Sequence, residues 1–241
     1  MLKFFLFGTC LMAMLSFSEA FHASVKGEGH YCIMFEGNIT GSIDYQKKDN
    51  TTSSHAFTVD ESSLSVGGDC YMHLDPKSNA TGETLTVAFI PLNSSEAQQQ
   101  WNLKIEFVSK QDNSFEIGDL TLSVLFGPEM NASIPSAEYK LKDSAEKWAV
   151  SDAGYACSSS KLELSNDSSL EFKNVRVLAF AQLPEDKFPS GQFYQECAAD
   201  SKTSEIVPII VGACLAGLVV VVLIAYLIGR ARAKRQGYAS V

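Results

Sequence analysis

The chain has 241 residues, a length that fits one domain with a sizeable core or two small ones. Its charge is divided unevenly: residues 21–205 carry 14 Lys and Arg against 27 Asp and Glu, a formal charge of −13, whereas the whole chain carries −9. Such an acidic segment repels polyanions, which argues against nucleic acid or anionic lipid as its partner.

The first predicted element is a signal peptide over residues 1–20. Lys3 precedes an apolar stretch at residues 4–17, and Ser18, Glu19 and Ala20 then form the small-x-small pattern that signal peptidase cleaves. A signal anchor is the alternative, but the apolar stretch is short and a separate stop-transfer segment follows later in the chain. We therefore expect a type I membrane protein whose mature chain begins near Phe21.

Residues 21–205 are predicted to form a single luminal domain built of β-strands. Apolar and polar residues alternate in four segments, as in half-buried strands: residues 84–90, 103–107, 120–126 and 170–181. The apolar phase slips near Asn174, which predicts a β-bulge there. Only residues 94–101 and 144–148 suggest short helical turns. Since no linker-like stretch or internal repeat interrupts the segment, the predicted fold class is all-β, with antiparallel sheets.

Four of the six cysteines lie in the predicted luminal domain, at Cys32, Cys70, Cys157 and Cys197. Cys10 belongs to the signal peptide and Cys214 to the long apolar run near the C-terminus. Four cysteines permit three pairings, and sequential pairing would close two similar loops, each contributing about 4 kcal/mol through chain entropy. Zinc binding is the rival interpretation. The oxidising compartment and the lack of Cys-x-x-Cys or His-x-x-x-His spacing favour disulfides and no metal.

The luminal segment also contains six Asn-x-Ser/Thr sequons, none with Pro in the middle position: Asn38, Asn50, Asn79, Asn93, Asn131 and Asn166. One sequon often occurs by chance, but six in a chain routed to the secretory pathway predict a heavily glycosylated surface. We expect all six segments to face solvent.

A transmembrane helix is predicted at residues 206–228. This run has no charged residue and, at about 1.5 Å per residue, reaches roughly 34 Å, enough to cross a hydrocarbon core of about 30 Å. Four basic residues follow between positions 230 and 235, which places residues 229–241 in the cytosol. Small-x-x-x-small pairs between residues 212 and 217 permit close approach of two helices, so self-association is a secondary expectation.

The cytosolic tail contains a Tyr-x-x-apolar quartet from Tyr238 to Val241, preceded by Gly237. Clathrin-adaptor medium subunits read this pattern: an extended peptide pairs with a sheet edge, and the tyrosine and the apolar residue enter separate pockets. Most such quartets are buried strand residues, but a tail of 13 residues has no core to bury one. The tail therefore predicts a sorting signal at Gly237, Tyr238 and Val241, with an adaptor as partner.

Catalytic and nucleotide-binding motifs are missing from the chain. It has no Gly-x-Ser-x-Gly elbow, no His-Glu-x-x-His, no Walker-type loop and no Gly-x-Gly-x-x-Gly between a strand and a helix. His73 and Asp75 are close in sequence, but such a lone pair is far more often solvated than catalytic. We predict no enzyme, no catalytic residue and no cofactor.

Several motifs together resemble one known family. The segments 207–212, 215–218 and 223–230 look like that family's span, and Gly237-Tyr238 followed by an apolar residue looks like its tail. Upstream, residues 154–157 (Gly-Tyr-Ala-Cys), the strand at 174–181, and Gly-Gln-Phe at 191–193 leading to Glu-Cys at 196–197 are also similar. On these motifs the chain is identified as a member of the lysosome-associated membrane glycoproteins (LAMPs), most similar to a nematode member with one luminal domain.

The resemblance implies a β-prism-like luminal domain with the disulfides Cys32–Cys70 and Cys157–Cys197. It also implies residence in lysosomal and late endosomal membranes, as part of a glycan coat that contributes to lysosome integrity and biogenesis. Larger members carry two such domains joined by a Pro-rich hinge, whereas this chain shows one domain and no hinge. A sorting companion or receptor that escorts a membrane or luminal cargo along the endolysosomal route is the alternative function.

Overall fold

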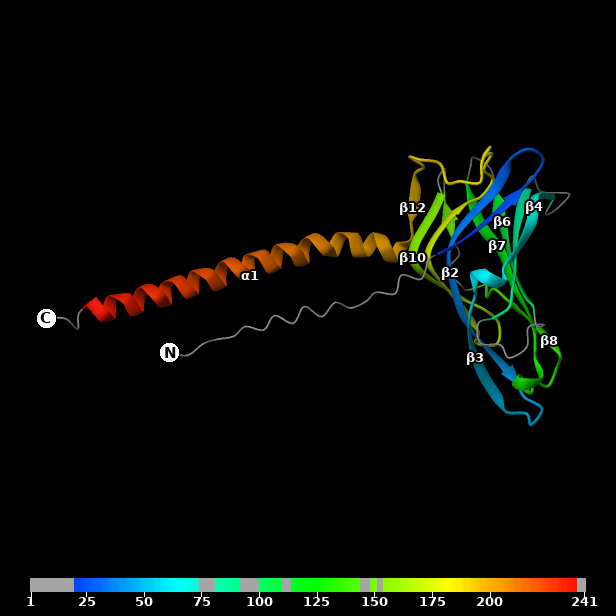
Figure 1. Ribbon diagram of the computed structural model, residues 1–241, viewed down its shortest axis with the longest axis horizontal. Coiled ribbons are helices and arrows are strands. Elements are labelled where there is room, and N and C mark those ends of the chain that lie inside the picture. Colours follow the sequence, from blue (N-terminus) through cyan, green and yellow to red (C-terminus); the bar gives the residue numbers. More distant parts are fainter. Residues whose placement is uncertain are drawn as a thin grey trace.

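The structure is a computed structural model that describes residues 20–73, 81–91, 100–109, 114–143, 148–150 and 154–237, without the side chains at 73, 202–207 and 231–237. The described chain forms strands, two short 3-10 helices and one long α-helix (Figure 1). The elements are β1 Phe21–Lys26, β2 Tyr31–Gln46, β3 Thr52–Thr58, η1 Glu61–Ser63, β4 Ser65–His73, β5 Thr81–Phe89, β6 Trp101–Ser109, β7 Phe115–Leu125, η2 Pro128–Met130, β8 Ser136–Lys140, β9 Ala149–Val150, β10 Gly154–Glu163, β11 Ser169–Leu178, β12 Tyr194–Glu196 and α1 Ala198–Gly237.

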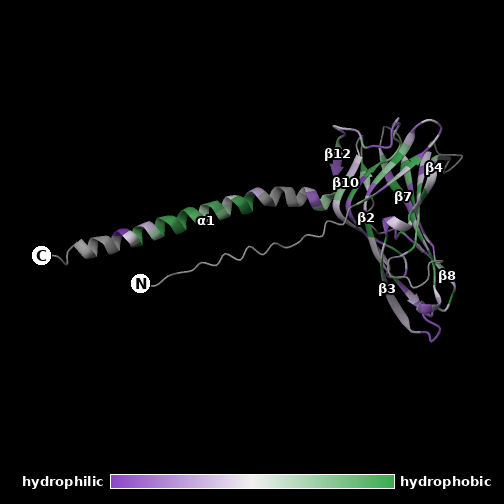
Figure 2. Ribbon diagram, in the orientation of Figure 1, coloured by the Kyte–Doolittle hydropathy of each residue, from purple (hydrophilic) through white to green (hydrophobic). Residues whose placement is uncertain are grey.

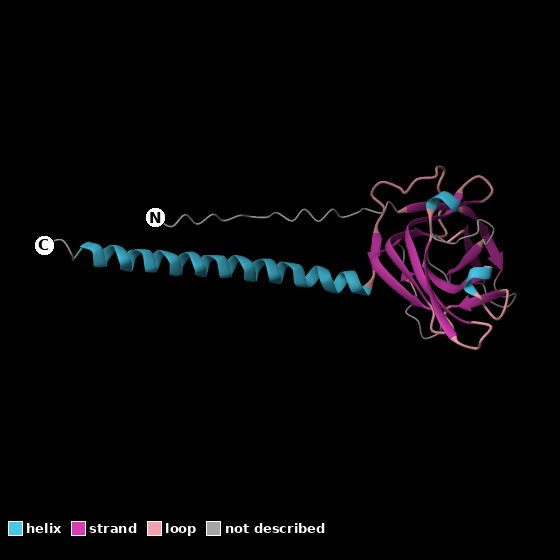
Figure 3. Cartoon of the chain, turned by 60° about the horizontal axis from the view of Figure 1, so that its bottom comes forward, coloured by secondary structure: helices cyan, strands magenta, loops and turns pink. Residues whose placement is uncertain are grey.

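The strands are divided between two sheets that pack on one core (Figure 3). The first has the order β1-β2-β11-β10-β12, with β3 also paired to β2, and the second has the order β4-β5-β6-β7-β8, with β9 also paired to β7. All pairs are antiparallel except β10 with β12, which is parallel. The predicted all-β class with antiparallel sheets is therefore confirmed.

Alternation of apolar and polar residues places one face of each strand in the core. In β6, Leu103, Ile105 and Phe107 are buried while the residues between them face outward. Aromatic contacts join the two sheets. The Phe57 ring of β3 lies 5.0 Å from the Trp101 ring and 6.0 Å from the Phe89 ring, centroid to centroid. These rings fix the distance between the sheets near the end of β3.

One edge of each sheet is shared by two short strands. β2 pairs with β1 over residues 31–37 and with β3 over residues 40–46, while β11 occupies its other edge. In the second sheet, β8 and β9 share one edge of β7 in the same way. These four strands are only two to seven residues long, and short edges of this kind resist pairing with other chains.

The predicted strands are confirmed, with shifted boundaries. β5, β6, β7 and β11 correspond to the four predicted segments, although β5 ends at Phe89 and β7 at Leu125, one residue before the predicted ends. The register between β11 and β2 shifts between Lys173 and Arg176, where Asn174 adopts a left-handed backbone (φ 50°). The predicted strand end at residue 181 is wrong, because β11 stops at Leu178 and Phe180 has a positive φ of 55°.

The two predicted helical turns fall mainly on residues outside the described part of the chain. At their ends, Trp101 already belongs to β6, and Trp148 lies immediately before β9 without helical structure.

α1 projects from the domain as one continuous helix (Figure 1). Its central part is apolar, as Figure 2 shows, and residues Pro208–Arg230 are long and apolar enough to cross a membrane and are not buried against the described domain. The predicted span at 206–228 overlaps this segment. One candidate span among the described residues fits a single-pass membrane protein.

Candidate functional site

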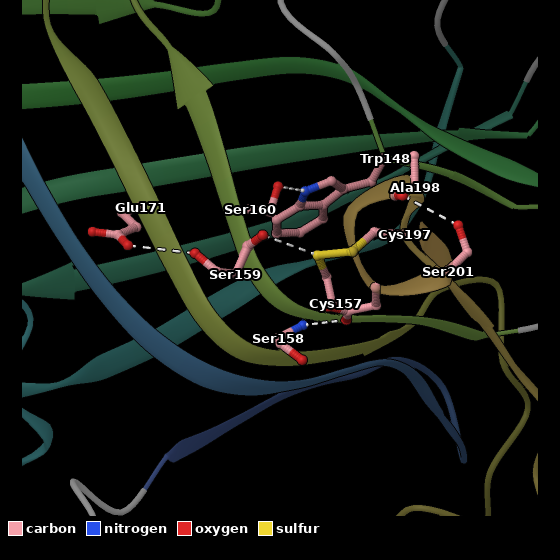
Figure 4. The surroundings of a disulfide bond; sticks show 10 residues. Trp148, Cys157, Ser158, Ser159, Ser160, Glu171, Cys197, Ala198 and Ser201 are labelled. Carbon is pink, nitrogen blue, oxygen red and sulfur yellow. Dashed lines mark hydrogen bonds between the residues drawn. A yellow bond between two sulfur atoms is a disulfide. The ribbon is translucent and has the colours of Figure 1, made fainter. Parts of the chain in front are cut away.

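The chain passes from the luminal domain to α1 through a short strand and a disulfide. After β12, the backbone N–H of Cys197 donates to the Ala156 carbonyl over 3.0 Å. A disulfide joins Cys197 to Cys157 of β10, with their Cα atoms 5.2 Å apart (Figure 4). Since α1 begins at Ala198, the residue immediately before the helix is fixed to β10 both by the disulfide and by a backbone hydrogen bond.

Aromatic packing supports this junction from the core side. The Trp148 indole lies beside the disulfide in Figure 4, and its Nε1 donates to the Ser160 hydroxyl over 2.8 Å. The same ring stacks on Tyr155 at 5.1 Å and meets the Phe172 ring edge-on at 4.7 Å. The junction therefore rests on buried, mutually packed rings rather than on a loop.

The junction also contains a set of possible metal ligands in the described part of the chain. The sulfur atoms of Cys157 and Cys197 and a carboxylate oxygen of Asp200 lie within 4.8 Å of one another. The two sulfur atoms form a disulfide bond with each other, so neither is a thiolate that could bind zinc. The Asp200 carboxylate instead accepts the Ser158 backbone N–H over 2.7 Å.

The other disulfide joins the two sheets. Cys32 at the start of β2 is fully buried and is bonded to Cys70 of β4, with Cα atoms 5.5 Å apart. The structure thus contains the sequential pairing that the family resemblance implies. One disulfide ties sheet to sheet, and the other ties the domain to α1.

The described sequons occupy two kinds of position. Asn50, Asn131 and Asn166 are exposed on turns and all have left-handed backbones, with φ of 62°, 49° and 56°. Asparagine tolerates this conformation better than most residues, so the sequence places it where the chain must turn sharply. Asn38 lies within β2, partly buried, opposite Lys173 of β11. Asn79 and Asn93 lie outside the described residues.

The three turn sequons meet at one end of the domain, which we call the glycan end. The backbone N–H of Lys48, in the β2–β3 turn beside Asn50, donates to the Asn131 carbonyl over 3.0 Å. The Ser168 hydroxyl, in the turn that carries Asn166, accepts the backbone N–H of Asp44 over 3.0 Å. Turns that are far apart in the sequence are therefore adjacent, at the lower end of the domain in Figure 1.

A cleft of about 440 Å³ opens between the sheets at the glycan end. Its walls include Tyr45, Tyr139 and the half-exposed Ile134. The Tyr139 hydroxyl donates to the Asp44 carbonyl over 3.0 Å, and burial, with a smaller effect of Asp44, raises the pKa of Tyr139 to about 12. Tyr139 thus remains a hydrogen-bond donor and ties β8 to β2 across the cleft.

Glu83 is the one charged side chain buried in the described core, and the sequence analysis did not identify it. It lies in β5 with an exposed fraction of 3%, and its Oε2 accepts the backbone N–H of Phe180 over 2.7 Å. Burial raises the pKa of Glu83 to about 8, although the hydrogen bond from Phe180 opposes the rise. The sequence contains a signal for this burial, because Glu83 is in phase with Leu85, Val87 and Phe89, which alternate toward the core.

The predicted sorting signal falls at the limit of the described chain. Gly237 is the last residue of α1, and Tyr238 and Val241 lie outside the described residues. The helix thus continues past the predicted span into the predicted tail. The role of these residues in sorting stays a prediction.

Comparison with known proteins identifies the family. Residues 13–197 match the family described as Lysosome-associated membrane glycoprotein 2-like, luminal domains, and residues 207–239 match Lysosome-associated membrane glycoprotein 2, transmembrane segment. The chain is 28% identical over 227 residues to Lysosome-associated membrane glycoprotein 1 of Bos taurus, and 30% identical over 224 residues to that of Mus musculus. These alignments cover 92% and 90% of this chain but 48% of each relative, so the chain spans about half the length of the curated relatives it matches.

Solved structures show the same fold. The membrane-proximal domain of mouse LAMP-1 matches with a TM-score of 0.55 at 22% identity, covering 75% of this chain and 98% of that domain. The membrane-distal domain of mouse LAMP-2 matches with a TM-score of 0.54 at 16% identity, covering 74% and 99%. The resemblance to a nematode member in particular is not tested by these mammalian relatives. The luminal domain and the span together place the chain in the lysosome-associated membrane glycoprotein family, as a single-pass lysosomal membrane glycoprotein.

Proposed function

We propose that this protein is a non-catalytic component of the luminal glycan coat of lysosomal and late endosomal membranes, and that it contributes to lysosome integrity and biogenesis. The observation that carries the proposal is the glycan end: three sequons on adjacent exposed turns of a rigid, disulfide-bonded domain. Glycans at Asn50, Asn131 and Asn166 would extend from one pole of the domain and cover the turns there. Exposed turns are the preferred sites of proteolytic cleavage, so this coverage protects the chain where it is most vulnerable.

The electrostatics of the domain support the same role. Residues 21–205 carry a formal charge of −13, which makes neighbouring copies repel one another and keeps them apart from anionic lipid. Acidic domains with attached glycans would therefore spread over the membrane surface. The covalent link between Cys157 and Cys197 keeps each domain fixed to its anchor.

Delivery to the lysosome is proposed to depend on the tail. Tyr238 would occupy one pocket of a clathrin-adaptor medium subunit and Val241 a second pocket, with the intervening backbone paired to a sheet edge. Truncating a central aromatic anchor typically costs about 2 kcal/mol or more, which is about thirtyfold in affinity. A sorting contact of micromolar affinity does not absorb such a loss.

The test is Tyr238→Ala, with Ser240→Ala as the matched control in the same quartet. We expect Tyr238→Ala to accumulate at the cell surface, measured by surface biotinylation, while Ser240→Ala reaches lysosomes normally. The surface fraction of Val241→Ala should lie between those of the other two variants, because binding of Val241 removes less apolar area from water than binding of Tyr238 does. Normal lysosomal delivery of Tyr238→Ala would show that the lumen or the span carries the address instead.

The cleft at the glycan end favours a second candidate function, that of a companion or receptor for a luminal ligand or cargo. Its volume lies within the usual range for sites that bind small ligands, and aromatic side chains are common in the walls of such sites. The two candidates differ in a pull-down from detergent-solubilised lysosomes. One stoichiometric partner that is lost on replacing Ile134 with Ser would favour the receptor, and abundance without a dominant partner would favour the coat.

A further inference from the structure

The first strand begins at the residue that follows the predicted signal peptide. β1 starts with Phe21, whose side chain has an exposed fraction of 2% and packs on the Phe35 ring at a centroid distance of 5.4 Å. Phe21 is also in register with Gly37 of β2, so the sheet holds the first residue of β1 in a fixed place. Cleavage after Ala20 would therefore leave the new N-terminus on the folded sheet itself and not on an extension beyond it.

Ala20 lies in the wall of a cleft of about 370 Å³ at the junction between the domain and α1. The charged residues in the same wall come from four elements: Glu36 of β2, Arg176 of β11, Glu196 of β12 and Asp200 in the first turn of α1. Three carboxylates and one guanidinium give these residues a formal charge of −2. The cleft thus joins the beginning of the luminal chain to its end, in an anionic setting.

Two of the three carboxylates have no cation beside them in the described part of the chain. The Arg176 guanidinium pairs with Glu36, whereas no ion pair between described residues includes Glu196 or Asp200. The Asp200 carboxylate accepts the Ser158 backbone N–H over 2.7 Å, which turns it toward β10. Because an ionised carboxylate has about four acceptor positions, Asp200 can accept a further donor.

We propose that the α-ammonium of Phe21, created when the signal peptide is removed, docks in this cleft and pairs with Glu196 and Asp200. Signal peptidase adds water across the Ala20–Phe21 peptide bond. The carboxylate formed on Ala20 leaves with the signal peptide, and the amine formed on Phe21 takes up a proton. A neutral amide in the wall of the cleft is thereby replaced by a cation with three N–H donors.

The place of this ammonium is set by β1 and not by the acidic residues. Its nitrogen is the atom that joins Phe21 to Ala20, and Ala20 lines the cleft. Loss of Ala20 also frees the space that this residue occupies in the wall. The ammonium and the two carboxylates are complementary in charge, and the short segment that carries the ammonium is already ordered by the sheet, so little entropy opposes the contact.

This ion pair would add a third link at the junction. The Cys157–Cys197 disulfide and the pairing of β12 with β10 fix the end of the domain, and the ammonium attaches the beginning of the chain at the same place. A luminal aminopeptidase can remove Phe21 only after β1 opens locally, and the rate of removal follows the open fraction when opening is fast. Docking of the ammonium lowers that fraction and protects the N-terminus.

The experiment uses the full chain, expressed through the secretory pathway and purified in detergent micelles. Mass spectrometry first identifies its N-terminal peptide, and a chain that begins at any residue other than Phe21 overturns the proposal. The protein is then treated with a water-soluble carbodiimide, which joins an amine to a carboxylate that it touches without inserting a spacer. We expect peptide mapping to recover the Phe21 amine joined to Glu196 or Asp200.

The cross-link has an internal positive control in the same sample. The Lys142 Nζ lies 3.4 Å from the Asp167 Oδ1, so this pair should be joined under the same conditions. Recovery of the Lys142–Asp167 link without any link from the Phe21 amine would overturn the proposal. A link from Phe21 to Glu36 alone would overturn it as well. Both outcomes are read in the wild type and do not depend on the stability of a variant.

A double variant tests the proposed partners. Glu196→Gln combined with Asp200→Asn should abolish the link and make release of Phe21 by an aminopeptidase about two- to fivefold faster, the range that a surface ion pair supplies. The Asp200→Asn side chain keeps an oxygen that accepts the Ser158 N–H, so the contact with β10 is preserved. Glu185→Gln, the matched loss of an exposed carboxylate outside the cleft, should change neither result. Equal release of Phe21 from the wild type and the double variant would overturn the proposal.

Discussion

Glu83→Gln should make the luminal domain less sensitive to pH. The Glu83 carboxyl ordinarily ionises near 4.5 in an unfolded chain, and burial raises its pKa to about 8 in the folded domain. The folded state therefore holds the proton more tightly than the unfolded state does. By linkage, the stabilisation that the protonated Glu83 gives to the folded domain is fully present below pH 4.5 and is lost as the pH rises to 8.

The size of the effect follows from the two pKa values. Between pH 5 and pH 7 the unfolded carboxyl is mostly ionised, while most folded molecules keep the proton. The free energy of unfolding should therefore fall by on the order of 2 kcal/mol over this interval through Glu83 alone. Gln has nearly the same shape, and its amide oxygen still accepts the Phe180 N–H, but it does not ionise. The variant should lack this component of the pH dependence.

Urea unfolding followed by tryptophan fluorescence measures this. The chain has two tryptophans, Trp101 and Trp148, and both are buried in the luminal domain, so the signal reports on this domain even in the full chain held in detergent. The quantity to compare is the difference in unfolding free energy between wild type and Glu83→Gln at pH 5, 6, 7 and 8. Parallel curves would refute the reasoning, because they would show that water or a partner solvates the Glu83 carboxylate in the folded domain.

The remaining predictions concern the disulfides and one glycine of β2. Replacing both Cys32 and Cys70 with Ala should lower the free energy of unfolding by about 4 kcal/mol, and the Cys157–Cys197 pair should give a similar loss, because the closed loops have separations of 38 and 40 residues; markedly unequal losses in urea melts would contradict the chain-entropy account. Gly41→Ala should cost about 1–3 kcal/mol, because a Cβ there would lie 2.6 Å from the Phe57 ring and 2.8 Å from the Ser169 carbonyl oxygen. Gly67→Ala, with open space around its Cβ, is the matched control in thermal melts.

Strands with one exposed face were predictable because their periodicity is visible locally. β6 and β7 alternate cleanly, and the slip at Asn174 correctly located the bulge in β11. β2 was not predicted, because its first half is buried as a continuous apolar run, from Cys32 to Phe35, which has no alternation to detect. β4 was hidden by Gly67, Gly68 and Asp69, residue types that are rare in strands.

The candidate sites divide along the same line. Sequons and cysteines are readable as motifs, whereas the contact between His22 and Asp186 spans 164 positions, and no local pattern relates the two residues. Glu83 was overlooked because an acidic residue in a strand is normally assigned to the solvent face. Its phase with Leu85 was a better guide than its charge. Only the three-dimensional fold shows that the Phe180 amide is its partner.

Glu83 makes one segment of the domain depend on protonation. A carboxyl that is buried without a cation is tolerated when it carries a proton. Glu83 contacts the segment after β11 through Phe180, and this segment leads to β12, Cys197 and α1. Acidification therefore strengthens the part of the domain that holds it to the membrane anchor.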